Sequence, residues 1–372
     1  MRSCPVCSGS TKESVTRTRL PALNNVTFST RKGARSAPAG RFVLATCQSC
    51  GFSHNQAFQS ELVIYEENYD NYVESPVFKA YYEDLVQLIR RRFELENGTV
   101  YEIGCGSGEF LRILCAVVPS VSGVGIDPSC EDTQDGNFRL INGTVEDVSV
   151  DLDARLVILR HVLEHIEDPV SFLKNLRDIF PRSAFFIEVP DFDWILRNGA
   201  FWDLTYEHCN YFTLSTMCLA LEMAGFYVVE QERSFGDQYQ WTICNSSNRG
   251  VSLAADTSLS LAAVETYVEL EAARLETVCS ASEAADHFVL WGMAGKGVNL
   301  AALLAEDQIA GGVDMNSAKQ GRYAPVSGVQ IHSPEWLNSL RAATVLVMNP
   351  NYLDEIGDLI KRLEIQANLI TI

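Results

Sequence analysis

The chain has 372 residues, 47% of them hydrophobic, which is enough to bury more than one hydrophobic core. Its formal net charge of −19 argues against nucleic acids and membranes as partners, because both attract proteins with a dominant positive field. The first residues do not resemble a secretory signal, no apolar run has the length of a membrane span, and eleven scattered cysteines do not suggest a disulfide framework. We therefore expect a cytoplasmic, multidomain protein that is a monomer or a homodimer.

The first segment, residues 1–70, is predicted to form a small domain of its own. Residues 1–50 hold eight Lys or Arg residues and one acid and carry +7, whereas the remainder carries −26. Apolar periodicity is weak here, so a small domain in this segment needs a disulfide or a bound metal to stabilise its fold. Two Cys-x-x-Cys pairs, Cys4 with Cys7 and Cys47 with Cys50, supply four thiolates that can complete a closed tetrahedral zinc shell. A structural Zn²⁺ site is the favoured interpretation, and two redox-active pairs are the alternative.

Residues 71–250 show strands alternating with helices, which predicts a parallel, doubly wound α/β sheet. A helix over residues 75–93 leads into this domain, and residues 191–203 are expected to be a loop. The last two strands, residues 227–231 and 239–244, are expected at an antiparallel edge. The other strands are predicted at residues 100–103, 123–126, 138–141, 156–159 and 184–189, and the other helices at residues 110–117, 170–180 and 214–224.

A glycine turn follows the first of these strands. Gly104, Gly106 and Gly108 have the spacing G-x-G-x-G, which lets the backbone turn sharply and approach a ligand at a helix N-terminus. The preceding acid, Glu102, suits a cationic sulfonium that carries an amino acid better than it suits a pyrophosphate. Asp127 closes the next strand, where it can accept both ribose hydroxyls. We therefore predict a site for S-adenosylmethionine of the class I methyltransferase type, with a generic nucleotide-binding turn as the alternative. Further expected contacts to this cofactor are Cys105, Glu146 near the adenine, and Arg160.

Two segments contain candidate catalytic histidines. Residues 160–169 follow the fourth strand at the edge where ligands bind, and His161 is the preferred candidate there, since Glu164 and His165 are expected to be solvent-facing or capping groups. Further along, Glu207 and His208 are adjacent, and an imidazole beside a carboxylate is a plausible general base. Tyr206 joins this candidate catalytic group. Thr205 and Asn210 are expected to contact substrate, whereas a histidine packed in the core is the competing interpretation of His208.

The last segment, residues 251–372, is predicted to be a second α/β domain. A connecting helix over residues 255–284 precedes a glycine-rich turn at residues 292–297, in which Lys296 could face a phosphate of the substrate. A plain tight turn is the alternative. The expected strands are residues 288–291, 312–313, 344–347 and 369–372, with a helix at residues 299–305.

In combination, these features resemble the sugar C-methyltransferases of deoxysugar biosynthesis. That resemblance covers essentially the whole chain, and it implies a class I methyltransferase Rossmann-like sheet between a small zinc-binding N-terminal domain and a C-terminal Rossmann-like α/β domain. It also implies S-adenosylmethionine-dependent methylation of a carbon atom in a nucleotide-linked keto-sugar, with the nucleotide held partly by the last domain. The resemblance assigns zinc to Cys4, Cys7, Cys47 and Cys50, the cofactor to the three glycines and Asp127, and catalysis to Glu207 and His208.

The chain departs from that family in two segments. Thr205 and Tyr206 stand where the family has Tyr-His before Glu-His, and the segment from His161 to His165 replaces the family's Asn-Val-Leu-Ala-His. These departures concern the substrate rather than the cofactor. The alternatives are therefore an O- or N-methyltransferase acting on a sugar or another small metabolite, and a noncatalytic zinc-bearing binding subunit.

Overall fold

The computed structural model describes residues 3–65, 69–70, 73–246 and 258–372, and these form an α/β fold with three β-sheets. An antiparallel sheet of four strands, a mixed sheet of eight strands and a parallel sheet of five strands follow one another along the chain. The expected α/β class, with a small N-terminal unit and a C-terminal α/β unit, is confirmed.

The N-terminal sheet has the order β1-β2-β3-β10. Its strands are β1 (Thr11–Pro21), β2 (Ala39–Cys47), β3 (Ser53–Asn55) and β10 (Asn210–Tyr211), with helix α1 (Arg31–Arg35) between the first two. Irregularities interrupt the β1–β2 pairing at two places, so the alternation of apolar and polar residues that marks a strand is broken. This explains why the sequence shows little periodicity here. Because β10 comes from residues 210–211, residues 1–70 alone do not complete this sheet.

The central sheet has the order β11-β12-β9-β8-β4-β5-β7-β6. Strand β12 is antiparallel to both β9 and β11, which confirms the predicted antiparallel edge. Its strands are β4 (Thr99–Ile103), β5 (Ser122–Asp127), β6 (Thr133–Asp135), β7 (Phe138–Asn142), β8 (Leu156–Arg160), β9 (Ala184–Pro190), β11 (Tyr227–Ser234) and β12 (Tyr239–Asn245). Its helices are α2 (Pro76–Arg92), α3 (Glu109–Val117), α4 (Pro169–Ile179), α5 (Phe192–Asn198) and α6 (Leu214–Met223), with 3₁₀ turns η2 (Val145–Asp147), η3 (Leu163–His165) and η4 (Phe201–Asp203).

One helix of this region differs from the sequence prediction. Residues 191–203 contain α5, where a loop was expected. The side chain of Asp191 caps its first turn by accepting from the Asp193 N–H, and Gly199 ends it in a left-handed conformation.

The C-terminal sheet has the order β15-β14-β13-β16-β17, and all of its pairings are parallel. Its elements are α7 (Ser258–Ala284), β13 (His287–Trp291), α8 (Gly295–Leu303), β14 (Gly311–Val313), β15 (Ile331–His332), β16 (Ala343–Val347), α9 (Leu353–Arg362) and β17 (Ala367–Ile370). The connecting helix is confirmed from Ser258 onward, while residues 255–257 lie outside the described residues.

Helix α8 begins four residues earlier than predicted, inside the expected glycine turn. A Cβ atom at Gly297 would lie 2.2 Å from the Gly292 carbonyl oxygen, so the close approach of the helix to the turn before it requires glycine at position 297. The prediction of a helix starting at residue 299 was therefore wrong.

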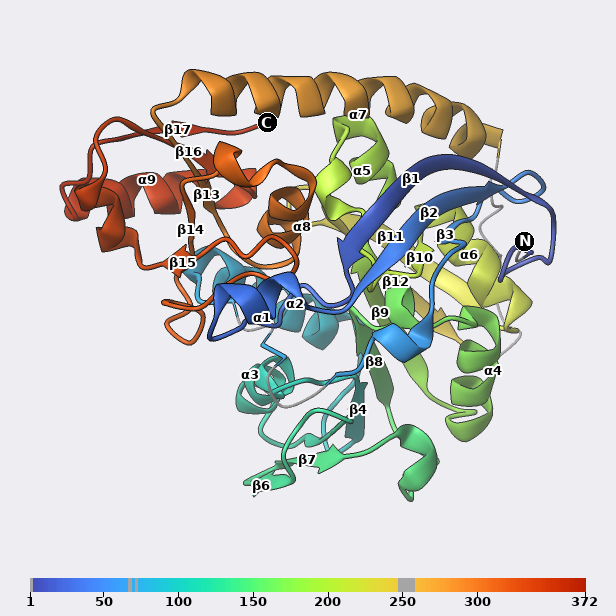
Figure 1. Ribbon diagram of the computed structural model, residues 1–372. Helices are drawn as coiled ribbons and strands as arrows, with labels where there is room; N and C mark the ends of the chain where they lie inside the picture. The colour runs from blue at the N-terminus through green and yellow to red at the C-terminus, as the bar shows by residue number, and fades with distance from the viewer. Residues whose placement is uncertain (1–2, 66–68, 71–72, 247–257) are drawn as a thin grey trace.

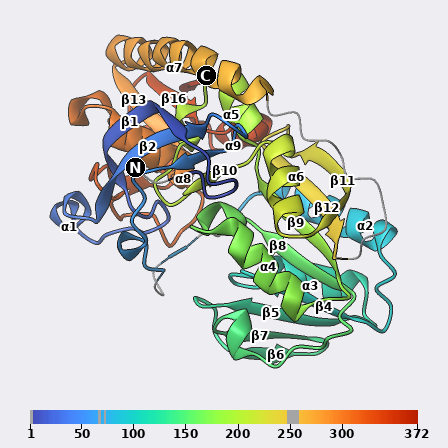
Figure 2. The ribbon, with the colours of Figure 1, turned by 90° about the vertical axis from the view of Figure 1, so that its right-hand side faces the viewer.

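The N-terminal sheet shares one buried cluster with the C-terminal sheet and another with the central sheet. One buried cluster joins Leu44 of the N-terminal sheet to Trp202, Tyr267 of α7 and Leu290 of β13. Figures 1 and 2 show the strands β1 and β2 beside the C-terminal unit, with β4, β6 and β7 toward the bottom of both views and α7 along the top. Among the described residues, no helix is long and apolar enough to cross a membrane.

Candidate active site and four-cysteine site

The glycine turn connects β4 to α3 at the carboxyl edge of the central sheet. Gly104, Gly106 and Gly108 have positive φ angles of 74°, 52° and 74°. A Cβ atom at Gly104 would lie 2.2 Å from Cγ2 of Val162. Both the backbone conformation and the close packing therefore require glycine at position 104.

Two acids flank this turn. Asp127 ends β5, and its carboxylate accepts the N–H of Gly106 at 2.8 Å and the N–H of Ser129 at 2.8 Å. Glu102 is only 2% exposed, and its Oε2 atom has no hydrogen-bond partner in the described part of the chain. Burial raises the pKa of Glu102 to about 7. A buried carboxyl group with one unpaired oxygen beside a glycine turn fits a ligand that carries an amine or another cation.

A cavity of about 840 Å³ opens at this edge of the sheet. The predicted cofactor residues that line it are Glu102, Gly104, Cys105, Gly106, Asp127, Glu146 and Arg160. Gly108 shapes the turn without lining the cavity, and Glu146 accepts a hydrogen bond from Asn175 at 2.5 Å. The sequence analysis missed six aromatic lining residues, Tyr65, Tyr69, Phe78, Tyr82, Phe110 and Phe172. Phe78 and Tyr82 belong to the apolar pattern of α2, but Tyr65 and Tyr69 carry no motif.

A buried ionic network forms one wall of the cavity. The Arg160 guanidinium lies 4.3 Å from the Tyr82 ring centre and 4.2 Å from that of Phe110, and it donates to Glu188 at 2.8 Å. His161 contacts the same Glu188 through Nε2 at 3.1 Å. Burial opposes protonation of His161, but its interactions with Glu164 and Glu188 raise its pKa to about 9. His161 is thus positively charged at neutral pH and is suited to hold this wall rather than to accept a proton.

Two other histidines meet beside the cavity. The rings of His165 and His208 pack edge to face with centroids 4.8 Å apart, and His165 lines the cavity. The Nδ1 atom of His165 lies 3.0 Å from the Glu207 carbonyl oxygen and 2.9 Å from the Tyr65 hydroxyl. Burial and the neighbouring His165 lower the pKa of His208 to about 3, so its imidazole is neutral and holds a free lone pair.

The structure separates the Glu207 side chain from His208. Its carboxylate accepts the Asn24 N–H at 3.2 Å and the Tyr69 hydroxyl at 3.1 Å, and burial raises its pKa. Among the described residues, the carboxylate that comes near the two imidazoles is Glu164, whose ligand atom lies within 4.8 Å of those of His165 and His208. Glu164 is 1% exposed and is therefore not the solvent-facing group that the sequence analysis expected.

The remaining candidate residues lie in the wall around this cluster. Thr205 accepts the His208 N–H at 3.3 Å, and Asn210 donates to the Ile166 carbonyl at 2.5 Å. The Tyr206 ring is fully buried, and its hydroxyl accepts the Gln59 N–H at 3.0 Å. Lys296 forms an ion pair with Asp203 at 2.5 Å. These four side chains hold segments of the chain together, and none of them lines the 840 Å³ cavity.

Comparison with known protein families agrees with this geometry. Residues 77–231 match a family described as a methyltransferase domain, and residues 256–370 match a C-methyltransferase C-terminal domain. The chain joins these two domains.

Individual relatives match over part of the chain. C-methyltransferase NovU of Streptomyces niveus is 31% identical over 157 residues, which cover 39% of this chain and 37% of the relative. The match thus spans little more than a third of that curated protein. Among solved structures, a chain from a complex of the Trm112 methyltransferase activator of Haloferax volcanii with a methyltransferase is 16% identical, with a TM-score of 0.38, and covers 47% of this chain and 93% of its own. A SAM-dependent methyltransferase from Aquifex aeolicus is also 16% identical, with a TM-score of 0.35, and the match covers 46% of this chain and 93% of that structure's chain. With TM-scores this low, the fold assignment rests on the strand order.

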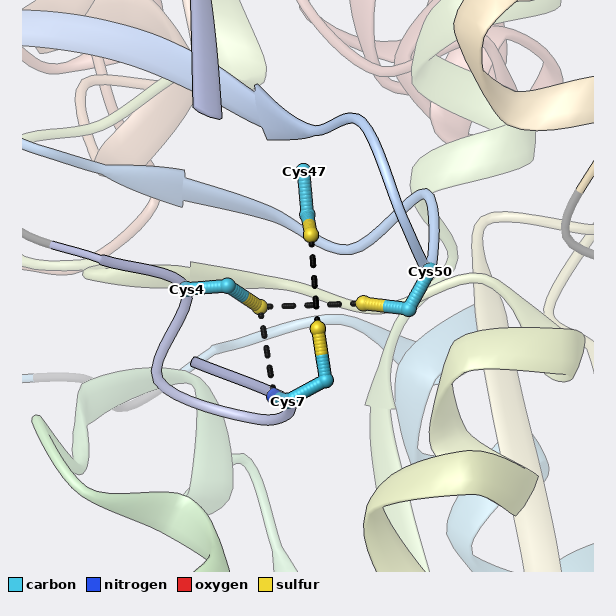
Figure 3. A group of neighbouring side chains, drawn as sticks. All are labelled: Cys4, Cys7, Cys47 and Cys50. Carbon is cyan, nitrogen blue, oxygen red and sulfur yellow. Dashed lines mark hydrogen bonds between the residues drawn. The ribbon is translucent and has the colours of Figure 1, made fainter. Parts of the chain in front are cut away.

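Four cysteine side chains converge where the N-terminal sheet packs on the methyltransferase domain. Figure 3 shows the sulfurs of Cys4, Cys7, Cys47 and Cys50 pointing toward a common centre. The Sγ atoms of Cys4 and Cys50 are 3.7 Å apart, and those of Cys7 and Cys47 are 3.4 Å apart. Tetrahedral zinc with Zn–S bonds of about 2.3 Å requires S–S separations of about 3.8 Å. All four Sγ atoms lie within 4.8 Å of one another, so the four thiols are close enough to hold one metal ion.

These cysteines belong to the core of the neighbouring domain. Cys4, Cys47 and Cys50 share one buried cluster with Phe212 and Met217, which follow β10. The four-cysteine site thus supports the sheet in which β10 pairs with β3, two residues after His208.

Proposed function

We propose that the protein is an S-adenosylmethionine-dependent C-methyltransferase that acts on a nucleotide-linked keto-sugar. The observation that carries this proposal is the match of residues 256–370 to the C-terminal domain of C-methyltransferases, because it points to carbon as the acceptor. The related C-methyltransferase NovU is consistent with it.

The residues around the cavity fit S-adenosylmethionine, which supplies an electrophilic methyl group when bound. The glycine turn offers backbone N–H groups at the start of α3, and the unpaired Glu102 carboxylate suits the ammonium group of the ligand. Asp127 is placed to accept ribose hydroxyls. Cys105 and Glu146 contribute to the same wall, and Arg160 holds that wall in place through Glu188.

In this proposal His208 is the general base. A carbon atom becomes nucleophilic enough for methylation only when a base removes a proton beside a carbonyl group. His208 takes up that proton and the substrate carbon becomes an enolate carbon. This carbon would accept the methyl group as the methyl–sulfur bond of the sulfonium breaks, which would leave S-adenosylhomocysteine. Thr205 fixes the backbone of His208, while Glu207 holds Tyr69 and the backbone of Asn24 in the surrounding wall.

The four cysteines are proposed to hold a structural Zn²⁺ ion. All four coordination positions would be filled by sulfur, so this ion would stabilise the fold without taking part in catalysis.

The test is incubation with methyl-labelled S-adenosylmethionine and a panel of nucleotide keto-sugars, with the methylated atom located by NMR. Wild-type protein is expected to form a new C–CH₃ group. His208→Asn should lower kcat by about 100-fold or more and leave the Kd for S-adenosylmethionine unchanged. The control is His287→Asn, at the start of β13.

Two outcomes would contradict the proposal. Full turnover by His208→Asn would show that His208 is not the base. Methylation of an oxygen or nitrogen atom would show that the acceptor is not carbon.

A further inference from the structure

Glu164 is a buried carboxylate that the mechanism above does not use. It lies in η3, and neither of its carboxylate oxygens has a hydrogen-bond partner in the described part of the chain. Its nearest recorded charged partner is His161, whose Nδ1 is 3.4 Å from Oε1. The positively charged His161 therefore faces one oxygen of this buried carboxylate, and a second positive charge on a neighbouring group would stabilise it further.

The hydrogen bonds of His165 and His208 show which groups lie near the Glu164 carboxylate. The Glu207 carbonyl oxygen can only accept, so the Nδ1 atom of His165 carries a hydrogen and donates to it. Glu164 also only accepts, and no hydrogen bond to the His208 ring is found among the described residues. A carboxylate oxygen of Glu164 and one ring nitrogen each of His165 and His208 lie within 4.8 Å of one another. A proton added to His208 would give this cluster a hydrogen-bond donor from which the Glu164 carboxylate could accept.

We propose that Glu164, rather than the adjacent Glu207, is the positioning residue that stabilises the protonated form of His208. This inference rests on the proposed function, in which His208 removes a proton from the substrate. The oxygens of Glu207 already accept hydrogen bonds from Asn24 and Tyr69, whereas neither oxygen of Glu164 accepts one in the described part of the chain, although Oε1 is paired with His161.

The charges around His208 give the sign of the effect. His165 of η3, His161 at the end of β8 and Lys296 of α8 all disfavour its protonated form, and Glu164 favours it. The Tyr211 ring of β10 packs at 6.5 Å without adding charge. Removing the negative charge of Glu164 would therefore leave a weaker base.

The test compares Glu164→Gln with the wild-type protein in steady-state kinetics as a function of pH. Glu164→Gln is expected to lower kcat by about 10- to 100-fold with little change in KM, and to move the acid limb of the kcat profile to lower pH. Glu164→Asp keeps the charge and should recover part of both effects. Glu167→Gln is the matched control, because it removes an exposed carboxylate three residues away.

Three results would overturn the inference. One is a Glu164→Gln variant with wild-type kcat and acid limb. Another, if Glu164→Gln does not fold, is a Glu164→Met variant, which also removes the charge, with wild-type kcat and acid limb. The third is a second bound metal ion, beyond the four-cysteine site, that is lost in Glu164→Gln while a chelator abolishes wild-type turnover. Failure of the proposed function has a separate signature, full turnover by His208→Asn, which does not depend on any Glu164 variant.

Discussion

At the scale of single residues, Gly104 is constrained by its backbone and by its neighbour. Its φ angle of +74° disfavours any side chain, and the space that a Cβ atom would need is filled by Val162. Val162 lies between His161 and η3, so the turn and the histidine segment pack directly against each other.

Gly104→Ala is expected to destabilise the protein by about 1–3 kcal/mol and to weaken S-adenosylmethionine binding by about tenfold or more. Urea unfolding and calorimetry measure the two effects. The double variant Gly104→Ala/Val162→Ala should relieve the clash but keep the backbone strain, so it should not bind better than wild type. Unchanged affinity in Gly104→Ala would show that the turn does not form the cofactor site.

The raised pKa of Glu102 predicts how the affinity for S-adenosylmethionine depends on pH. Because burial raises its pKa to about 7, the carboxyl group is neutral below that pH and negatively charged above it. S-adenosylmethionine affinity should therefore weaken as pH falls from 8 to 6, and Glu102→Gln should bind weakly at every pH. Calorimetry across this range, with exposed Glu96→Gln as the control, checks the expectation. A pH-independent wild-type Kd would contradict it.

The Glu102 carboxyl group also makes the free energy of unfolding depend on pH. Between about pH 4.5 and 7 the folded protein binds a proton at Glu102 that the unfolded chain releases. Its contribution to the free energy of unfolding therefore decreases as pH rises through that window.

At the scale of elements, strand β2 shapes the loop that carries His208. A Cβ atom at Gly40 would lie 2.1 Å from Cε2 of Tyr206, two residues before His208. The tight packing of this ring on β2 gives Tyr206 a structural role that its place beside Glu207 did not reveal.

Gly40→Ala should displace Tyr206 and with it the backbone of residues 205–208. We expect a stability loss of about 1–3 kcal/mol and a lower kcat, with an unchanged Kd for S-adenosylmethionine. Gly357→Ala is a matched control, because its Cβ would meet only Leu369 at 4.0 Å. Equal kinetics in both variants would show that β2 does not position the loop.

The elements also show what the sequence could and could not predict. The central strands are continuous apolar runs, so they were predicted nearly to the residue, whereas the bulges of β1 conceal its pairing. Helix α9 was missed although Leu353, Ile356 and Ile360 have helical spacing, so a signal for it was present. The proximity of Glu164 to His208 could not be predicted, because more than forty residues separate the two in the sequence.

At the scale of the whole molecule, the four-cysteine site connects the N-terminal sheet to the methyltransferase domain. The buried cluster around Cys47 includes Phe52, which packs on Phe212 with ring centres 5.1 Å apart. The loss of metal at this site should therefore affect the region of His208.

Cys47→Ser is expected to lose bound zinc, to lower the Tm and to reduce turnover. A structural zinc site contributes several kcal/mol, and each 1 kcal/mol corresponds to roughly 2–4 °C in a domain of this size. Elemental analysis and calorimetry measure the effects, with Cys279→Ser in α7 as the control. Unchanged zinc content in Cys47→Ser would refute the metal assignment.

The most direct test of the central claim is proton exchange without the methyl donor. In D₂O, wild-type protein should catalyse deuterium incorporation at the carbon beside the ketone of its nucleotide-sugar substrate, as followed by NMR, and His208→Asn should not. Methylation of that substrate by wild-type protein without any exchange, or equal exchange by wild type and His208→Asn, would contradict a carbon methyltransferase in which His208 is the base.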